Sequence, residues 1–172
     1  TDPQLDLTLE PGETAVWVGV YHEEREATFT LALGPPHGRN AARGLRPDAA
    51  PVLGTANFDV PETPTAYEGA FRGEHALRAL HPTCGGLVGT APDLNVLTSV
   101  DRDVTFDVNA DGDATLLLRL PDGTLVCDDD SGEGRDPRIR RTLRPGLYQV
   151  WVGRIGRRGD DFTLRVAPAA GS

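Results

Sequence analysis

The sequence predicts an all-β protein, an antiparallel β-sandwich or jelly roll, with an N-terminal partial repeat of the same unit. Three observations predict it. Short segments in which apolar and polar residues alternate follow one another along the chain, turns rich in Gly and Pro separate them (20 Gly and 14 Pro in 172 residues), and no stretch sustains a helical period. Short strands at such spacing are typical of sandwiches and jelly rolls.

Residues 1–33 repeat the last strands of the unit that occupies residues 52–168. The agreement covers three segments in the same order, with one inserted residue, and it indicates a duplicated structural unit. The first copy lacks the acidic half of the unit. We therefore predict either that its strands complete a sheet elsewhere, in this chain or in a neighbour, or that the chain comes from a longer tandem array. The matching segments are 2–12 with 136–146, 16–19 with 150–153 and 29–31 with 162–164.

Between the two copies, residues 34–51 are polar and rich in Gly-Pro-Pro and Arg-Pro-Asp turns, and they are predicted to be a linker. The complete unit follows over residues 52–168, and residues 169–172 form a tail. Within the unit, residues 74–80 fit either a strand or one helical turn. The other predicted strands are 55–60, 66–72, 94–100, 103–108, 114–120, 124–127, 147–153 and 161–166.

Composition excludes several classes of protein. The formal charge is −9 and every basic residue is Arg, which argues against a nucleic-acid partner, because a nucleic-acid groove needs a basic stripe. No segment approaches about 20 consecutive apolar residues, so no membrane span is predicted. Neither a Met nor a signal peptide is visible, and we expect Thr1 to be a processed or trimmed end.

The two cysteines, Cys84 and Cys127, are too far apart in sequence for a C-x-x-C motif. One disulfide between them is the favoured interpretation, and two buried free thiols are the alternative. A structural disulfide contributes about 2–4 kcal/mol and persists in oxidising compartments. The protein is therefore predicted to be secreted or to lie at the cell surface.

Two acidic clusters follow predicted strands. The first opens like an EF-hand loop, but Leu118 stands where a bidentate Glu is required, so an EF-hand is rejected. The two clusters together could still bind Ca²⁺, which accepts about 6–8 oxygen ligands in flexible geometry. The alternatives are that the acids cap turns, or that Arg135, Arg138 and Arg140 neutralise them. The candidate calcium ligands are Asp107, Asp111, Asp113, Asp128, Asp129 and Asp130.

Nine short motifs follow one another through the complete unit. In order along the chain they are CGG at 84–86, PDL at 92–94, TLLL at 115–118, PDG at 121–123, CDDDSG at 127–132, DP at 136–137, PGLY at 145–148, VWVG at 150–153 and FTL at 162–164. In this order they resemble the bacterial pre-peptidase C-terminal (PPC) domain family. The resemblance implies a β-sandwich module of the kind attached to secreted proteases and other exported proteins. It also implies a module that is not catalytic in its own right and that, as in some members, binds calcium.

No catalytic site is predicted. Residues 130–134 resemble the serine-nucleophile segment of chymotrypsin-like proteases, but the four His residues have no matching context. These four (His22, His37, His75 and His81) are also interpreted as too dispersed for zinc, with none in a Cys/His ligand spacing.

Trp17 and Trp151 occupy equivalent positions in the two copies. If Val150 and Val152 face the core, Trp151 faces outward and offers a binding surface for a ligand or a partner chain. The alternative is that the other sheet or the linker covers it.

The leading functional hypothesis is a non-catalytic, calcium-stabilised extracellular module for binding or assembly, acting on an extracellular protein or polysaccharide. The alternative is a self-assembling subunit of a fibre or homo-oligomer, in which the N-terminal strands complete the sheet of a neighbouring chain or of an adjacent repeat.

Overall fold

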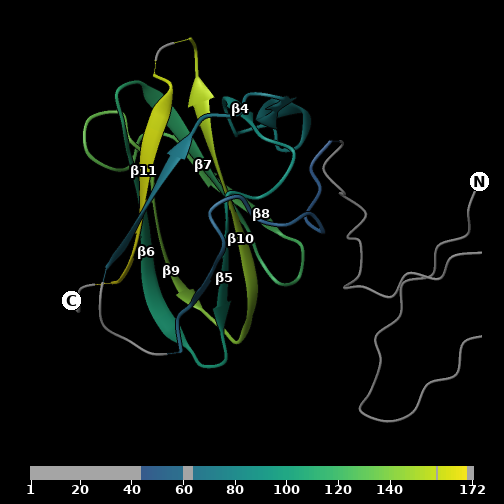
Figure 1. Cartoon of the computed structure of the whole chain (residues 1–172), viewed down its shortest axis with the longest axis vertical. Coiled ribbons are helices and arrows are strands. Elements are labelled where there is room, and N and C mark those ends of the chain that lie inside the picture. Colours follow the sequence, from purple (N-terminus) through teal and green to yellow (C-terminus); the bar gives the residue numbers. More distant parts are fainter. Residues whose placement is uncertain (1–43, 60–63, 158, 170–172) are drawn as a thin grey trace, which may run out of the picture. The chain divides into compact units, whose positions relative to one another are not determined.

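The computed structural model describes residues 44–59, 64–157 and 159–169 (Figure 1). These residues form eleven strands and one short 3₁₀ helix, η1, which confirms the predicted all-β class. None of the helical structure in these ranges is long and apolar enough to cross a membrane. The elements are β1 Thr55–Asn57, β2 Thr65–Ala70, β3 His75–Ala76, η1 Leu77–Ala79, β4 Leu87–Val88, β5 Leu94–Thr98, β6 Arg102–Ala110, β7 Asp113–Arg119, β8 Leu125–Asp128, β9 Arg138–Leu143, β10 Gly146–Ile155 and β11 Asp161–Pro168.

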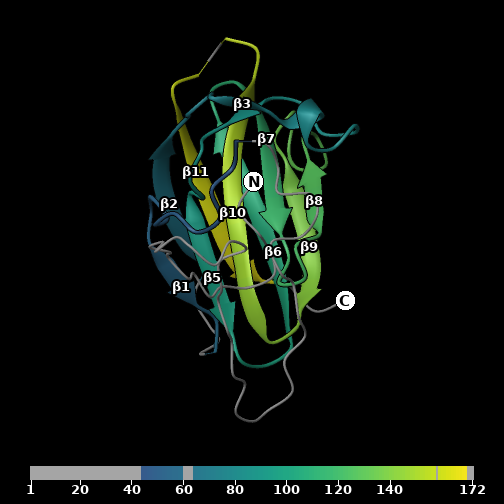
Figure 2. The same cartoon turned by 90° about the vertical axis from the view of Figure 1, so that its right-hand side faces the viewer.

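The strands form two sheets that face each other as a sandwich (Figure 1), and the view turned by 90° looks onto the larger sheet (Figure 2). In the larger sheet β10 is central: β5 and β4 pair with one of its edges, β7 with the other, and β8 continues beyond β7. The smaller sheet has the order β2-β11-β6-β9. All pairings are antiparallel except that of β1 with β5. The first repeat copy and the predicted linker up to residue 43 lie outside the described residues, so the domain boundaries stay a prediction.

The main core lies between the two sheets. Alternate residues of each strand point to the same face of a sheet, so the alternation in β6, β7, β10 and β11 places one apolar set inside. Each fully buried Leu, Val or Phe side chain contributes about 1.5–3 kcal/mol relative to an exposed one. The inward-facing residues of these four strands are Val104, Phe106, Val108, Ala114, Leu116, Leu118, Tyr148, Val150, Val152, Phe162, Leu164 and Val166.

A second, smaller core covers the outer face of the larger sheet. Trp151 points away from the main core, as its position between Val150 and Val152 predicts, but it is 0% exposed. It packs with Leu117 under a cover that includes Leu45, Leu77, Val88 and Cys84. The prediction of an exposed binding surface at Trp151 is therefore wrong, because the segment before β5 folds back over this face of the sheet. Trp17 lies outside the described residues.

One buried carboxylate, that of Asp93, accepts a backbone hydrogen bond from β10 beyond the point where its pairing with β5 ends. Asp93 is 3% exposed, and it lies just before β5, where the pairing of β5 with β10 ends at Val150. Its backbone N–H donates to the carbonyl of Val150 (2.8 Å), and its carboxylate accepts from the N–H of Val152 (2.7 Å). Burial raises the pKa of Asp93 to about 6, against the hydrogen bond from Val152 and the charge of Arg72, which lower it.

We expect Asp93→Asn to gain stability relative to the native protein as the pH rises. A folded-state pKa of about 6, above the ordinary value of about 3.9, favours folding while the group is protonated, and this contribution is lost as the pH rises through 6. The amide keeps an acceptor for Val152 and does not ionise. Between about pH 4 and about pH 8, the free energy of unfolding of the variant should therefore rise by about 2–3 kcal/mol relative to that of the native protein.

Urea unfolding at both pH values measures this shift. Asp48→Asn removes the same formal charge from an exposed site and is the control for the loss of one carboxylate. A pH-independent difference for Asp93→Asn would contradict the raised pKa.

Candidate functional site

The predicted calcium ligands come from neighbouring parts of both sheets. Asp107 lies on β6 in the smaller sheet, and Asp111 and Asp113 lie at the turn that carries the chain from β6 to β7 in the larger sheet. The other three, Asp128 to Asp130, end β8 and begin the turn toward β9. We call the connections β6–β7 and β8–β9, residues 107–113 and 128–138, the acidic turns.

Asp128 organises the second of these turns. Its carboxylate accepts hydrogen bonds from the N–H of Ser131 (3.0 Å), from the Ser131 hydroxyl and from the N–H of Arg138 (2.8 Å). This is the turn-capping role that Asp adopts in loops. The Ser131 hydroxyl is thereby bonded to a carboxylate, where a nucleophilic serine would need an imidazole base.

Arg side chains pair with two of the six predicted ligands. Arg138 Nε donates to Asp107, and Arg135 lies 3.8 Å from Asp113 Oδ2. The Arg135 side chain is 82% exposed, and an exposed ion pair of this kind contributes little. Arginine therefore neutralises part of the negative charge in the acidic turns, as the alternative interpretation predicted, and leaves the remainder.

Carboxylates of both turns influence one another at Asp129. Burial raises its pKa, and the neighbouring charges of Asp130, Asp128 and Asp113 raise it further. Asp113 belongs to the β6–β7 turn, so carboxylates of both turns contribute to the raised pKa of Asp129. Contacts between Arg135 and Asp113 and between Asn109 and Asp136 also join the two turns.

Sequence reasoning missed a further acid, Asp136. Burial raises its pKa despite hydrogen bonds that it accepts from the N–H of Ala110 and from Asn109 Nδ2 (3.2 Å), and the charges of Glu133 and Asp113 add to the rise. The Asp-Pro pair that opens the repeated segment at 136–137 was the available signal. Asp136 ties the β8–β9 connection to the end of β6.

The carboxylates do not converge on one point as they lie. Within the described ranges, a single group of three or more possible ligand side chains has its ligand atoms within 4.8 Å of one another, and it consists of His81, Cys84 and Cys127. Calcium binding at the acidic turns would therefore need some of these side chains to rotate.

A hollow of about 530 Å³ lies beside the acidic turns, on the outer face of the smaller sheet. Acidic residues from both turns and two arginines contribute to its walls, so it offers charges of both signs to a polar ligand. The charged and amide residues that line it are Asp107, Asn109, Glu133, Asp136, Arg138 and Arg165.

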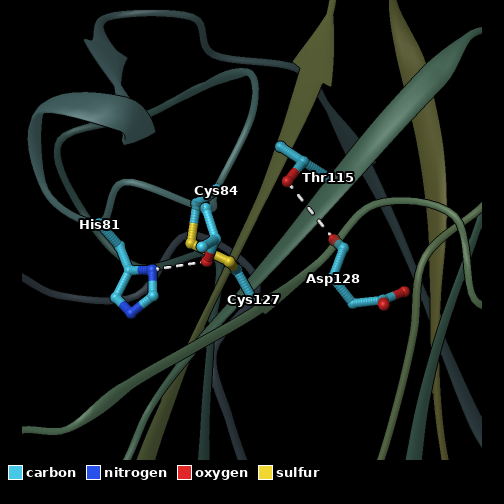
Figure 3. Close-up of a disulfide and its surroundings, with 6 residues drawn as sticks. His81, Cys84, Thr115, Cys127 and Asp128 are labelled. Carbon is cyan, nitrogen blue, oxygen red and sulfur yellow. Dashed lines mark hydrogen bonds between the residues drawn. A yellow bond between two sulfur atoms is a disulfide. The ribbon is translucent and has the colours of Figure 1, made fainter.

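The predicted disulfide between Cys84 and Cys127 is present, with 5.9 Å between the two Cα atoms (Figure 3). It joins the turn after η1 to β8. Beside it, Thr115 Oγ1 donates to the carbonyl of Asp128 (3.4 Å) and holds β8 against β7. The disulfide thus anchors the segment that covers Trp151, next to the start of the second acidic turn.

His81 was also missed. Its imidazole lies beside the disulfide, and it stands three residues before Cys84. The fold thus brings one histidine to the two sulfurs, which are bonded to each other.

No family model matches the sequence, and no curated protein does. Among solved structures, the pre-peptidase C-terminal domain of a collagenase from Bacillus anthracis aligns with a TM-score of 0.47 and 13% sequence identity. The alignment covers 70% of this chain and 97% of that chain. The assignment of the fold rests on the two observed sheets themselves.

Proposed function

We propose that this chain is a non-catalytic binding module of an exported protein, and that calcium held by the acidic turns stabilises it. The observation that carries the proposal is that the two acidic turns meet: Arg135 Nη1 of the second turn lies 3.8 Å from Asp113 Oδ2 of the first, and Asp136 accepts a hydrogen bond from Asn109 (3.2 Å). Calcium is the cation whose ligand requirement matches a group of carboxylate and carbonyl oxygens in flexible loops.

The charge balance supports this proposal. Residues 107–113 and 128–138 carry eight Asp or Glu and two Arg. Asp128 is engaged in its turn and Asp107 in an ion pair, so we expect Asp129 and Asp130 to supply the principal ligands. A bound ion would remove the repulsion and fasten the β6–β7 connection to the β8–β9 connection.

The binding role is inferred from the hollow beside these turns. Glu133 and Asp136 line it and belong to the second turn, so an ion that fixes this turn would also fix one wall of the hollow. The disulfide supports an oxidising location, since such bonds persist outside the reducing cytosol. We therefore expect the module to act at the cell surface or in the surrounding medium, on a polar ligand.

Calcium should raise the melting temperature of the native protein by roughly 10 °C relative to chelator. At a calcium concentration about 100 times the dissociation constant, binding to the folded state adds about 2.7 kcal/mol, and a domain of this size gains several degrees per kcal/mol. The double variant Asp129→Asn/Asp130→Asn should lose the shift, whereas Asp48→Asn, an exposed aspartate away from the turns, should keep it.

Differential scanning calorimetry with calcium and with chelator gives all three comparisons. Equal melting temperatures for the native protein in both conditions would show that calcium does not stabilise it. A shift that persists in the double variant would place the ion elsewhere in the chain.

A further inference from the structure

The group formed by His81, Cys84 and Cys127 has the chemistry of a second, different metal site. An imidazole nitrogen and the two sulfurs lie within 4.8 Å of one another. In the oxidised protein the sulfurs are bonded to each other, so they are not available as thiolates, the form in which cysteine binds metal.

The backbone fixes two of these three residues in one tight turn. The N–H of Cys84 donates to the carbonyl of His81 (3.1 Å), and the N–H of His81 donates to the carbonyl of Leu77 at the start of η1 (2.9 Å). The third residue, Cys127, lies on β8, whose pairing with β7 sets it opposite Leu117. Backbone hydrogen bonds on both sides therefore position the three side chains, in addition to the S–S bond.

The surroundings provide a partly buried site with one polar partner for the imidazole. Cys84 is 1% exposed and packs with Leu77, Leu117 and Trp151, while Cys127 and His81 are partly exposed. The Thr83 hydroxyl lies 2.9 Å from His81 Nδ1. Such an outer partner orients a ligating histidine.

We propose that reduction of the Cys84–Cys127 disulfide converts this group into a Zn²⁺ site with two thiolates and one imidazole as ligands. A water-soluble phosphine reduces the S–S bond to two thiols and becomes the phosphine oxide, with one water molecule supplying the oxygen and both thiol protons; a dithiol supplies both electrons and both protons itself and becomes a cyclic disulfide. Zn²⁺ then displaces both thiol protons and binds the neutral imidazole, and a water molecule takes the fourth tetrahedral position.

The required displacement is small. In a tetrahedral site with Zn–S bonds of about 2.3 Å, the two sulfurs lie about 3.8 Å apart. The three ligand atoms already lie within 4.8 Å of one another, and after reduction the two sulfurs have to separate to the spacing of such a site. Thiolates and imidazole select zinc over calcium, which makes this site independent of the calcium site proposed for the acidic turns.

The full chain, reduced with a water-soluble phosphine under argon, tests the proposal, with Co²⁺ as the probe and Zn²⁺ as the competitor. We expect one equivalent of Co²⁺ to produce thiolate-to-cobalt charge-transfer absorption, and Zn²⁺ to abolish it. The oxidised protein and the variant Cys84→Ser/Cys127→Ser should show no such band. Excess calcium should leave it unchanged, so failure of the calcium proposal would not affect this result.

The histidine is tested by two matched variants. His81→Gln should weaken Zn²⁺ binding by the reduced protein at least about tenfold, whereas His75→Gln, which replaces a histidine bonded to Thr90, should leave the affinity unchanged. Circular dichroism reports whether each reduced protein stays folded. Absence of the charge-transfer band in the reduced native chain, folded or unfolded, overturns the proposal, and so does native-like affinity in His81→Gln.

Discussion

Replacing both cysteines, Cys84→Ser/Cys127→Ser, is expected to lower the free energy of unfolding by about 4 kcal/mol. The disulfide closes a loop with a sequence separation of 43 residues, and the loss of chain entropy in the unfolded state predicts a stabilisation of this size. The loop contains β4, β5, β6 and β7, and it begins at Cys84, which packs in the cover over Trp151. Opening it therefore gives the unfolded chain more freedom and loosens the attachment of the smaller core.

Urea unfolding of the oxidised native protein and of the double variant measures the loss. The native protein reduced with phosphine in the presence of chelator is the control, and it should lose a similar amount because only the cross-link has changed. A loss below about 1 kcal/mol in both samples would mean that the bond does not constrain the unfolded chain as the entropy model requires.

Trp151→Ala is expected to cost about 3–5 kcal/mol, the range for removing a fully buried aromatic side chain. The indole is 0% exposed beneath Leu45, Leu77 and Val88, so truncation leaves a cavity between the larger sheet and its cover. Trp151→Phe keeps most of the apolar contact and should cost about half as much.

Thermal and urea unfolding of both variants gives the comparison. A tryptophan on an exposed binding surface would give a change within about 0.5 kcal/mol on truncation, so a loss that small would contradict its burial. Because Cys84 packs in the same cluster, the effects of the Trp151 and cysteine variants should not add.

The sequence predicted the inner face of the sandwich well. In β6, β10 and β11 every second residue is apolar, and a period of two assigns these residues to one face of a sheet without further information. The same reasoning placed Trp151 on the opposite face correctly. It then failed on exposure, because the cover is made by the segment containing β3, η1 and β4, whose two- or three-residue elements carry no periodic signal.

The candidate site was predictable only in part. Acidic residues after strands indicate turns, and the two turns do lie together. Whether their side chains converge depends on rotamers and on hydrogen bonds such as those that Asp128 accepts from Ser131 and Arg138, which no spacing in the sequence reveals. His81 could be matched with Cys84 by spacing, but its third companion, Cys127, is brought to it only by the fold.

The position of β9 bears on how copies of this protein meet each other. In the described part of the chain β9 forms an edge of the smaller sheet, paired with β6 alone, and it carries Arg138, Arg140 and Arg141. A free edge is a template for aggregation, and basic residues along it oppose the approach of an identical edge. The guanidinium groups of this strand therefore disfavour fibril growth through that side, even though the molecule as a whole is acidic.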